Sequence, residues 1–223
     1  MDNEKAYLEH LLSSKASPER AKANREITNS YFWGIFKSNR CTKVLDAGCG
    51  VGHFMLAAPR GISIIGIDSN KYVVEHCQKL GLNVSKASVE KTGLEEGTFD
   101  GVFCSHVLEH LEKPDEAMKE FRKFLVPGGL LVIRVPSPRF FHTDPTHITK
   151  FDLASLRELA GKTGFKNIRA YVYHYPFPFT NWQGQPYGAL NAARALPGIR
   201  EAFDYAVGLK GYPANELVLT AER

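Results

Sequence analysis

Apolar and polar positions follow two different patterns along the chain. Every fourth residue from Ala23 to Ile35 is apolar or aromatic, a spacing that predicts helix. From Lys43 onward, short apolar runs bounded by glycine or polar residues alternate with amphipathic stretches, which is typical of strands alternating with helices. Such alternation predicts a parallel sheet covered by helices on both faces. We therefore expect an α/β fold, with an N-terminal helical cap at residues 1–40 and the main domain at residues 41–223.

The expected elements of the main domain follow one another in a regular order. Seven strands are expected at residues 43–47, 62–68, 82–87, 99–106, 130–136, 166–175 and 215–222. Helices are expected between them at residues 54–58, 70–81, 114–126 and 152–164. The third of these begins at Pro114 and is expected to stop at Pro127-Gly128-Gly129. In parallel sheets ligands bind beyond the carboxyl ends of the strands, so residues there are the candidates for function.

One stretch, VLDAGCGVGHF at residues 44–54, begins in the first expected strand and then carries three alternating glycines. These are Gly48, Gly50 and Gly52. Glycines let the backbone turn sharply and let a ligand approach its N–H groups. The dinucleotide pattern Gly-x-Gly-x-x-Gly does not fit, because His53 occupies the place of its third glycine. Asp46 precedes the glycines, where a carboxylate repels a pyrophosphate and attracts an ammonium group. The loop therefore predicts a ligand that presents a cation.

A second acid, Asp68, ends the second expected strand, roughly 20 residues after the glycine loop. An acid at this place can accept hydrogen bonds from ribose hydroxyls. The alternative is that Asp68 caps the following helix. Taken with Asp46 and the glycines, the ribose interpretation is favoured.

Four stretches carry a resemblance to a known family. They are VLDAGCGVGHF, IIGIDSN, GTFDGVFCSHVLEHLEKPDEAMKEFRKFLVPGGLLVIRVPS and DPTHITKFDLASLRELAGKTGF, in order and spacing over roughly residues 41–175. They resemble class I S-adenosylmethionine-dependent methyltransferases, of the small-molecule type with VLEH and DPTH motifs. The resemblance implies a Rossmann-like seven-stranded sheet with one antiparallel strand at its edge. It also implies S-adenosyl-L-methionine as cofactor, whose ammonium is the cation expected at Asp46.

The resemblance assigns roles around this cofactor. The loop from Asp46 to Gly52 faces the methionine part, Asp68 takes the ribose hydroxyls, and Ser69 lies beside the adenine. Relatives commonly carry Asp where this chain has Ser88, which weakens the contact with the adenine amino group. The cofactor-binding residues expected are Asp46, Gly48, Cys49, Gly50, Gly52, Asp68, Ser69, Ser88, Val89 and Ser105.

Histidines and acids gather after the fourth and fifth expected strands. They are His106, Glu109 and His110, then His142, Asp144 and His147. Methyl transfer from a sulfonium needs mainly in-line positioning, with a general base where the acceptor holds a proton. His110 and His147 are the candidates for catalysis. Each also has a structural interpretation: residues 106–111 pack a short helical turn, and His147 ties down the Asp144-Pro145 turn.

A third interpretation of these residues is a metal site made by His106, Glu109, His110 and His147. It resembles the acid-rich site of small-RNA methyltransferases and of some quinone-precursor O-methyltransferases. His106 stands where those enzymes carry an acid, and a nitrogen-rich set favours a zinc- or iron-like ion over magnesium. The expected cofactor set is S-adenosyl-L-methionine without a resident metal.

The segment 176–211 is expected to be an inserted cover over the acceptor. Aromatic rings and prolines crowd its beginning, as in Phe179 and Trp182, and the prolines exclude a continuous strand or helix. Aromatic walls suit a small, partly hydrophobic acceptor and exclude water. The alternative is that these rings only cap the core.

The composition of the chain limits the classes of partner that are expected, but it does not identify the methyl acceptor. The chain has 223 residues and a net charge of +4, with no block of basic residues, which argues against nucleic acid. No run of about 20 apolar residues suggests a membrane span. The charged N-terminal stretch and four scattered cysteines favour a cytoplasmic protein without disulfides. The oligomeric state is left open.

Three alternatives to a small-molecule methyltransferase stay open. The first is a cofactor-binding partner subunit without catalysis, and the second is a methyltransferase acting on RNA or a peptide. The third is a dehydrogenase on a similar sheet, against which Asp46 and His53 count.

Overall fold

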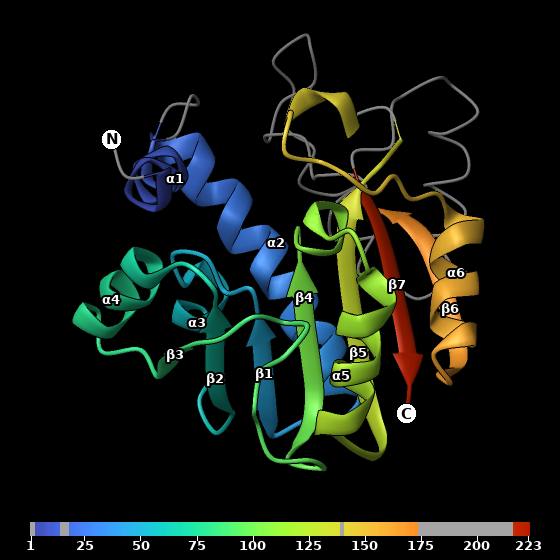
Figure 1. Cartoon of the computed structure of the whole chain (residues 1–223). Coiled ribbons are helices and arrows are strands. Elements are labelled where there is room, and N and C mark those ends of the chain that lie inside the picture. Colours follow the sequence, from blue (N-terminus) through green and yellow to red (C-terminus); the bar gives the residue numbers. More distant parts are fainter. Residues whose placement is uncertain (1–2, 14–17, 139–140, 174–215) are drawn as a thin grey trace, which may run out of the picture.

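The computed structural model describes residues 3–13, 18–138, 141–173 and 216–223. Their centre is a seven-stranded sheet in the order β3-β2-β1-β4-β5-β7-β6 (Figure 1). The strands are β1 Lys43–Ala47, β2 Ser63–Asp68, β3 Val84–Lys86, β4 Phe99–Ser105, β5 Leu125–Pro136, β6 Lys166–Tyr173 and β7 Glu216–Glu222. The α-helices are α1 Asn3–Leu12, α2 Pro18–Ser38, α3 His53–Leu56, α4 Lys71–Lys79, α5 Pro114–Phe124 and α6 Leu153–Lys162. Two short 3-10 helices are η1 Leu108–His110 and η2 Phe141–Thr143. The expected α/β sheet with flanking helices is confirmed.

The order of the strands differs from the expectation at one edge. β7 is the antiparallel strand, and it pairs with both β5 and β6. It therefore lies second from the edge, and the edge strand is β6, which runs parallel to the others. The expectation of an antiparallel strand at the edge was wrong, because sequence order does not say between which neighbours the last strand inserts.

The helices cover the two faces of the sheet with separate cores. On one face, α5 and α6 bury side chains such as Phe121 and Leu156 against the strands. On the other, α2 presents Phe32, Trp33 and Phe36, each no more than 2% exposed. The expected apolar row is shifted: Ile27, Tyr31 and Ile35 are only partly buried. The larger rings of α2 take the inner positions because they pack on Phe54 and Phe103. Phe54 and Phe103 belong to the same core as these rings.

The passage from α5 to β5 also differs from the expectation. The helix ends at Phe124 and the strand begins at Leu125, so Pro127-Gly128-Gly129 lie inside the strand instead of stopping the helix. The register jumps there: Leu125 pairs with Phe99 and Leu130 pairs with Gly101. The intervening residues form a bulge, which the positive φ of Gly128 permits.

Most of the other expected elements are confirmed to within a few residues. The expected strand 166–175 ends at Tyr173 in the part that is described. The inserted segment 176–211 lies outside the described residues. Among the helices that the structure describes, none is both long enough and apolar enough to span a bilayer.

Candidate functional site

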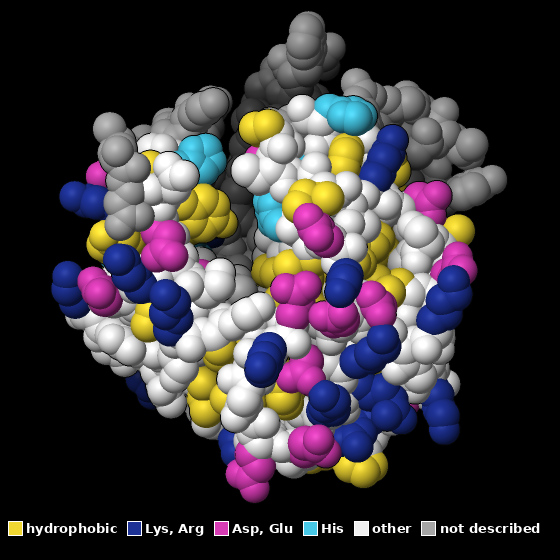
Figure 2. Space-filling model, viewed as in Figure 1, with side chains coloured by type: hydrophobic (Ala, Val, Ile, Leu, Met, Phe, Trp, Pro, Cys, Tyr) yellow, Lys and Arg dark blue, Asp and Glu magenta, His cyan; other side chains and the backbone are white. Residues whose placement is uncertain are grey.

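A cavity of about 860 Å³ opens beyond the carboxyl ends of β1, β2, β4 and β5. Figure 2 shows it as a hollow between two lobes, with histidine side chains near its sides. Residues from α1 and α2 also line it, including Tyr7 and Thr28. Of the residues expected to bind the cofactor, Asp46, Gly48, Cys49, Gly50, Asp68, Ser69, Ser88, Val89 and Ser105 line this cavity. The sheet thus brings together residues that are up to about 60 positions apart, as parallel sheets do at this edge.

Gly52, the tenth expected residue, does not line the cavity. It precedes α3 with φ +78, and a Cβ there would lie 2.4 Å from Cδ1 of Leu82. This glycine is required by the packing of the loop on the chain after α4. This contact gives Gly52 a packing role, and its expected part in cofactor binding stays a prediction.

The glycine loop folds back on the end of β2. The N–H groups of Gly48 and Cys49 both donate to the carbonyl oxygen of Ile67, at 2.8 and 3.0 Å. Gly48 has φ +78, and a Cβ there would lie only 2.3 Å from Cγ2 of Val107, in the loop after β4. The loop can approach its neighbour this closely only with glycine at this position.

Gly48→Ala is expected to destabilise the protein more than Gly81→Ala does. Both glycines have φ +78, but nothing lies within 4 Å of the Cβ position of Gly81. The matched pair isolates the clash with Val107, which should cost about 1–3 kcal/mol more. Urea unfolding of the two variants measures the difference. Equal losses of stability would show that the loop moves aside freely.

Asp46 is a buried acid with an unused oxygen. Asp46 is only 2% exposed, and its Oδ2 has no hydrogen-bond partner among the described residues. Burial, and then the nearby charge of Asp68, raises the pKa of Asp46 to about 8. A buried carboxyl of this kind favours a donor or a cation brought by a ligand.

Asp68 is held in place by two backbone donors. Oδ2 accepts from the Gly50 N–H at 3.0 Å, and Oδ1 accepts from the Asn70 N–H at 2.9 Å. Burial raises the pKa of Asp68, and these two hydrogen bonds act in the opposite direction. Asn70 is the N-cap of α4, since its Oδ1 accepts from Tyr72 and Val73. The alternative role of Asp68 as helix cap was wrong, and Asp68 lines the cavity.

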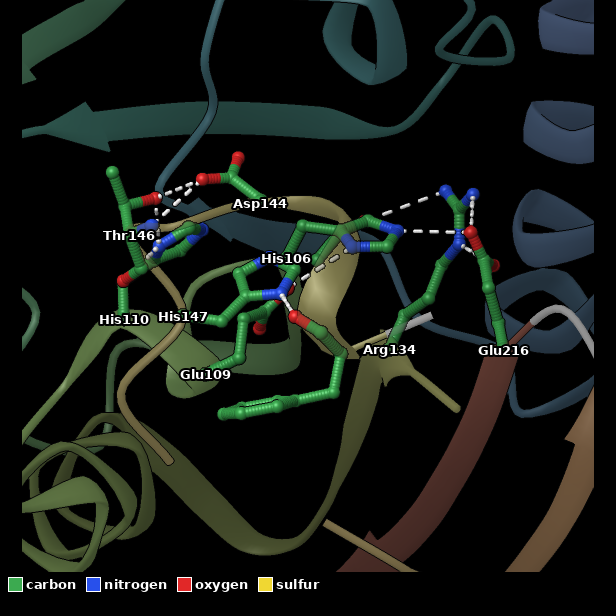
Figure 3. A network of polar contacts seen from close by, with 10 residues as sticks. His106, Glu109, His110, Arg134, Asp144, Thr146, His147 and Glu216 are labelled. Atoms are coloured by element: carbon green, nitrogen blue, oxygen red, sulfur yellow. Dashed lines mark hydrogen bonds and ion pairs between the residues drawn. The ribbon is translucent and has the colours of Figure 1, made fainter. Parts of the chain in front are cut away.

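His106 lines the cavity and has a left-handed backbone conformation, with φ +56. Its Nδ1 lies 3.0 Å from Glu109 Oε1, and its Nε2 lies 2.9 Å from Glu216 Oε1 (Figure 3). Burial opposes a charge on the ring, but Glu216 and Glu109 outweigh it and raise the pKa of His106 to about 9. Arg134 forms a two-pronged ion pair with the same Glu216. The attraction of Arg134 and His106 for the Glu216 carboxylate holds its pKa well below the usual range, against the effect of burial.

Glu109, His110 and His147 form a second group on the other side of His106. One potential metal-ligating atom of each lies within 4.8 Å of the corresponding atoms of the other two. The two imidazole rings have centroids 5.0 Å apart. Figure 3 shows this group beside His106, with Arg134 and Glu216 beyond it.

The structure separates the expected four-residue set of histidines and Glu109. His106 contacts Glu109 but turns its second nitrogen to Glu216, so it does not belong to the cluster of Glu109, His110 and His147. His142 is exposed and its ring contacts Phe141 edge to face, outside the cavity lining.

Sequence reasoning missed Arg134 and Glu216. Both are charged residues next to apolar neighbours in strands, in LLVIRVP and ELVLT. A charge inside an otherwise apolar strand is the signal that could have found them, because a buried charge needs a partner.

The segment that contains the glycine loop, Asp68 and η1 matches a protein family. Residues 45–133 fit the family model of the methyltransferase domain. This segment is thus similar to a methyltransferase domain. It includes the carboxyl end of β1, then β2 to β4 and most of β5, so the match covers the strand ends that form the cavity.

Curated relatives share the domain but differ in what they act on. The chain is 37% identical over 100 residues to 24-methylenesterol C-methyltransferase 3 of Arabidopsis thaliana, covering 40% of this chain and 28% of that protein. It is 31% identical over 147 residues to the tRNA U34 carboxymethyltransferase of Actinobacillus succinogenes, covering 56% of this chain and 46% of that protein. The matched region thus spans less than half the length of these two relatives.

A solved structure extends the likeness beyond the domain match. A SAM-dependent methyltransferase from Archaeoglobus fulgidus superposes with a TM-score of 0.64 and 21% identity, over 87% of this chain and 94% of that one. At this identity the likeness concerns the fold. The shared fold therefore extends beyond residues 45–133.

Proposed function

We propose that the protein is an S-adenosylmethionine-dependent methyltransferase that acts on a small, partly hydrophobic acceptor. The observation that carries the proposal is the buried Asp46 carboxyl, whose Oδ2 has no partner, in the wall of the same cavity as Asp68. Asp46 would take the ammonium group of the cofactor, and Asp68 would accept hydrogen bonds from its ribose hydroxyls. The methyltransferase domain at residues 45–133 supports this assignment.

The other residues expected to bind the cofactor, apart from Gly52, line the same cavity as these two acids. Gly48, Cys49 and Gly50 bring their backbone to the cavity, and Ser69, Ser88 and Val89 line it near Asp68. Ser88 is exposed, whereas Val89 is only 6% exposed and offers an apolar wall for a planar ring. A serine in place of an acid at 88 offers an uncharged acceptor, so the contact there should be weaker.

The chain's own contribution to methyl transfer would be positioning. When bound, the cofactor supplies a methyl group whose bond to the sulfonium breaks, with the electron pair staying on sulfur. The acceptor atom gives the electron pair for the new bond and loses its proton where it carries one. His110, at the wall of the cavity, and His147 beside it lie on the acceptor side, where a proton can be taken up.

Cofactor binding is expected to release a proton near neutral pH. In the free protein, burial keeps Asp46 largely protonated below its pKa of about 8. An ammonium group favours the carboxylate, so affinity should rise as pH increases from about 6 to 8 and then level off. Calorimetry in buffers of different ionisation enthalpy measures the released proton. An affinity that does not change over this range would argue against an ion pair at Asp46.

Asp46→Asn is the matched variant for the same acid. In the native protein, folding raises the pKa of Asp46. The free native protein therefore loses stability as the pH rises towards 8 and the buried carboxyl ionises. The neutral amide avoids that cost, so the variant should be more stable than the native protein at pH 8 to 9. It should nevertheless bind the cofactor more weakly. Thermal unfolding and calorimetry together give both quantities.

The acceptor can be identified by the transfer of an isotopically labelled methyl group to it. Incubation with cofactor carrying an isotopically labelled methyl group and with fractionated cell extract should label one small-molecule fraction. Label in RNA or protein fractions would favour the alternative of a methyltransferase that acts on RNA or a peptide. Cofactor binding without label in any fraction would favour a partner subunit without catalysis.

A further inference from the structure

We propose that Cys49 and Cys77 form a reversible redox pair, whose disulfide distorts the glycine loop (residues 46–52) and weakens cofactor binding. Formation of the disulfide does not depend on the proposed function, whereas its effect on the cofactor rests on that function. The other two cysteines of the chain, Cys41 and Cys104, serve as references.

The two thiols lie against the same backbone carbonyl. Cys49 belongs to the glycine loop after β1, and Cys77 lies in α4. The carbonyl oxygen of Gly50 lies 3.7 Å from Cys49 Sγ and 3.2 Å from Cys77 Sγ. Both side chains also belong to one small apolar cluster with Met55 and Val74. The fold therefore brings two thiols from different elements to one place.

A hydrogen bond between the two thiols makes them chemically unequal. This bond raises the pKa of Cys49, and burial acts in the same direction. The same bond lowers the pKa of Cys77, although burial acts against it. The thiolate is the nucleophilic form of cysteine, so the Cys77 sulfur is the one that attacks an oxidant. Cys49 is then the resolving thiol beside it.

The cavity gives a small oxidant access to this pair. Cys49 is 8% exposed and lines the cavity, whereas Cys77 is fully buried. An oxidant that enters the cavity therefore reaches Cys49 first and has Cys77 on the other side of the shared carbonyl contact. Hydrogen peroxide, which is little larger than water, is the oxidant of suitable size.

The reaction converts two thiols and one hydrogen peroxide into one disulfide and two waters. The Cys77 sulfur attacks one peroxide oxygen, the O–O bond breaks, and the leaving hydroxide takes the Cys77 proton to become water. The Cys49 sulfur then attacks the sulfenic acid formed on Cys77. As the S–S bond forms, the hydroxide on Cys77 leaves with the Cys49 proton as the second water. Both sulfurs are oxidised and both peroxide oxygens are reduced.

The disulfide would change the geometry of the glycine loop. Its sulfurs would lie about 2.05 Å apart, much closer than two hydrogen-bonded thiols, so the loop or α4 has to move. The Gly50 carbonyl would also lose its two S–H donors. The N–H of the same residue donates to Asp68 Oδ2 at 3.0 Å. A rotation of the loop at Gly50 would therefore disturb the acid that we propose for the ribose.

Cys41 and Cys104 lack the features of the pair. Burial, and then the nearby charge of Asp100, raises the pKa of Cys41 to about 12. Its Sγ donates to the Asp100 carbonyl oxygen at 3.3 Å. Cys104 is fully buried, and burial raises its pKa well above the usual value. Both stay protonated at neutral pH, so we expect peroxide to leave them unchanged.

Peroxide treatment of the reduced full chain tests the proposal. The protein is freed of reductant, exposed to hydrogen peroxide at neutral pH, alkylated to block the remaining thiols, and digested. We expect mass spectrometry to find one disulfide, between Cys49 and Cys77. The oxidised protein should bind S-adenosylmethionine about tenfold more weakly, the scale of one hydrogen bond to a charged group. Dithiothreitol should restore the affinity.

Cys77→Ala and Cys41→Ala are the matched variants, because each removes one buried thiol outside the cavity lining. Peroxide should leave the cofactor affinity of Cys77→Ala unchanged and should lower that of Cys41→Ala as it does in the native protein. Saturating S-adenosylmethionine should slow disulfide formation in the native protein, because oxidation and binding oppose each other.

Three results would overturn the proposal. They are thiols that stay reduced at positions 49 and 77, irreversible oxidation there without a disulfide, and a disulfide that leaves the affinity for S-adenosylmethionine unchanged. All three are measured on the native protein, so the test does not depend on the folding of a variant.

The reduced protein separates this proposal from the proposed function. Reduced protein that does not bind S-adenosylmethionine would contradict the proposed function, whatever the state of the two thiols. Reduced protein that binds the cofactor and keeps both thiols under peroxide would contradict the redox pair alone.

Discussion

Replacing His110 by alanine is expected to lower the turnover of methyl transfer by about 10²–10⁴-fold, the usual effect of losing a positioned proton acceptor. His110 lines the cavity, and its ring is fixed by Thr146. Cofactor affinity should be unchanged, since the hydrogen bonds of the His110 ring go to Thr146 and not to the glycine loop or Asp68. Turnover and cofactor affinity are measured on the same preparation.

His142→Ala is the control for this variant, because His142 lies near the same loop but is exposed and outside the cavity lining. It should keep its turnover. Unaltered turnover in His110→Ala, with only a lowered melting temperature, would show that the histidine serves to hold the loop. His147→Ala should behave like His110→Ala if the two act together, since their rings are neighbours.

The second large effect is expected at Asp68. Asp68→Ala should weaken binding of S-adenosylmethionine by about 1.5–3 kcal/mol, the range for hydrogen bonds to charged groups. This corresponds to a loss of about 10- to 150-fold in affinity. Calorimetric titration measures it directly.

Asp100→Ala is a matched control for Asp68→Ala. Asp100 also accepts backbone hydrogen bonds with both carboxylate oxygens, from Thr42 and Lys43, but near the amino ends of β1 and β4. Both variants lose a carboxylate that anchors backbone, so both should lose stability. Only Asp68→Ala should lose affinity. Equal affinity in the two variants would remove Asp68 from the ribose contact.

The fold was predictable from local patterns because each strand and helix is short and is bounded by clear signals. The apolar run at 63–68, for example, is followed by Asn70, whose side chain caps α4 as such a residue should. The lateral order of the last strands was not predictable, since β7 pairs with β5 and β6 through contacts between distant residues. The bulge at Gly128 was missed because glycine and proline were interpreted only as stop signals.

The cofactor half of the site was predictable because its residues lie close to two strand ends. Asp46 and Asp68 lie at the carboxyl ends of two parallel neighbouring strands, so the sheet itself brings them to one edge. The acceptor half depends on contacts that no local pattern encodes. The loop at 144–149 reaches back to η1 through the Glu109 carbonyl, and His106 is drawn away by Glu216, more than a hundred positions later.

Calorimetric titration of the native protein with S-adenosylmethionine and, separately, with NAD tests the central claim most directly. The predicted result is saturable one-to-one binding of S-adenosylmethionine, weakened in Asp68→Ala and Asp46→Asn and kept in Asp100→Ala, with no binding of NAD. Binding of NAD in its place, or affinity for S-adenosylmethionine that is absent or indifferent to both acids, would contradict the account.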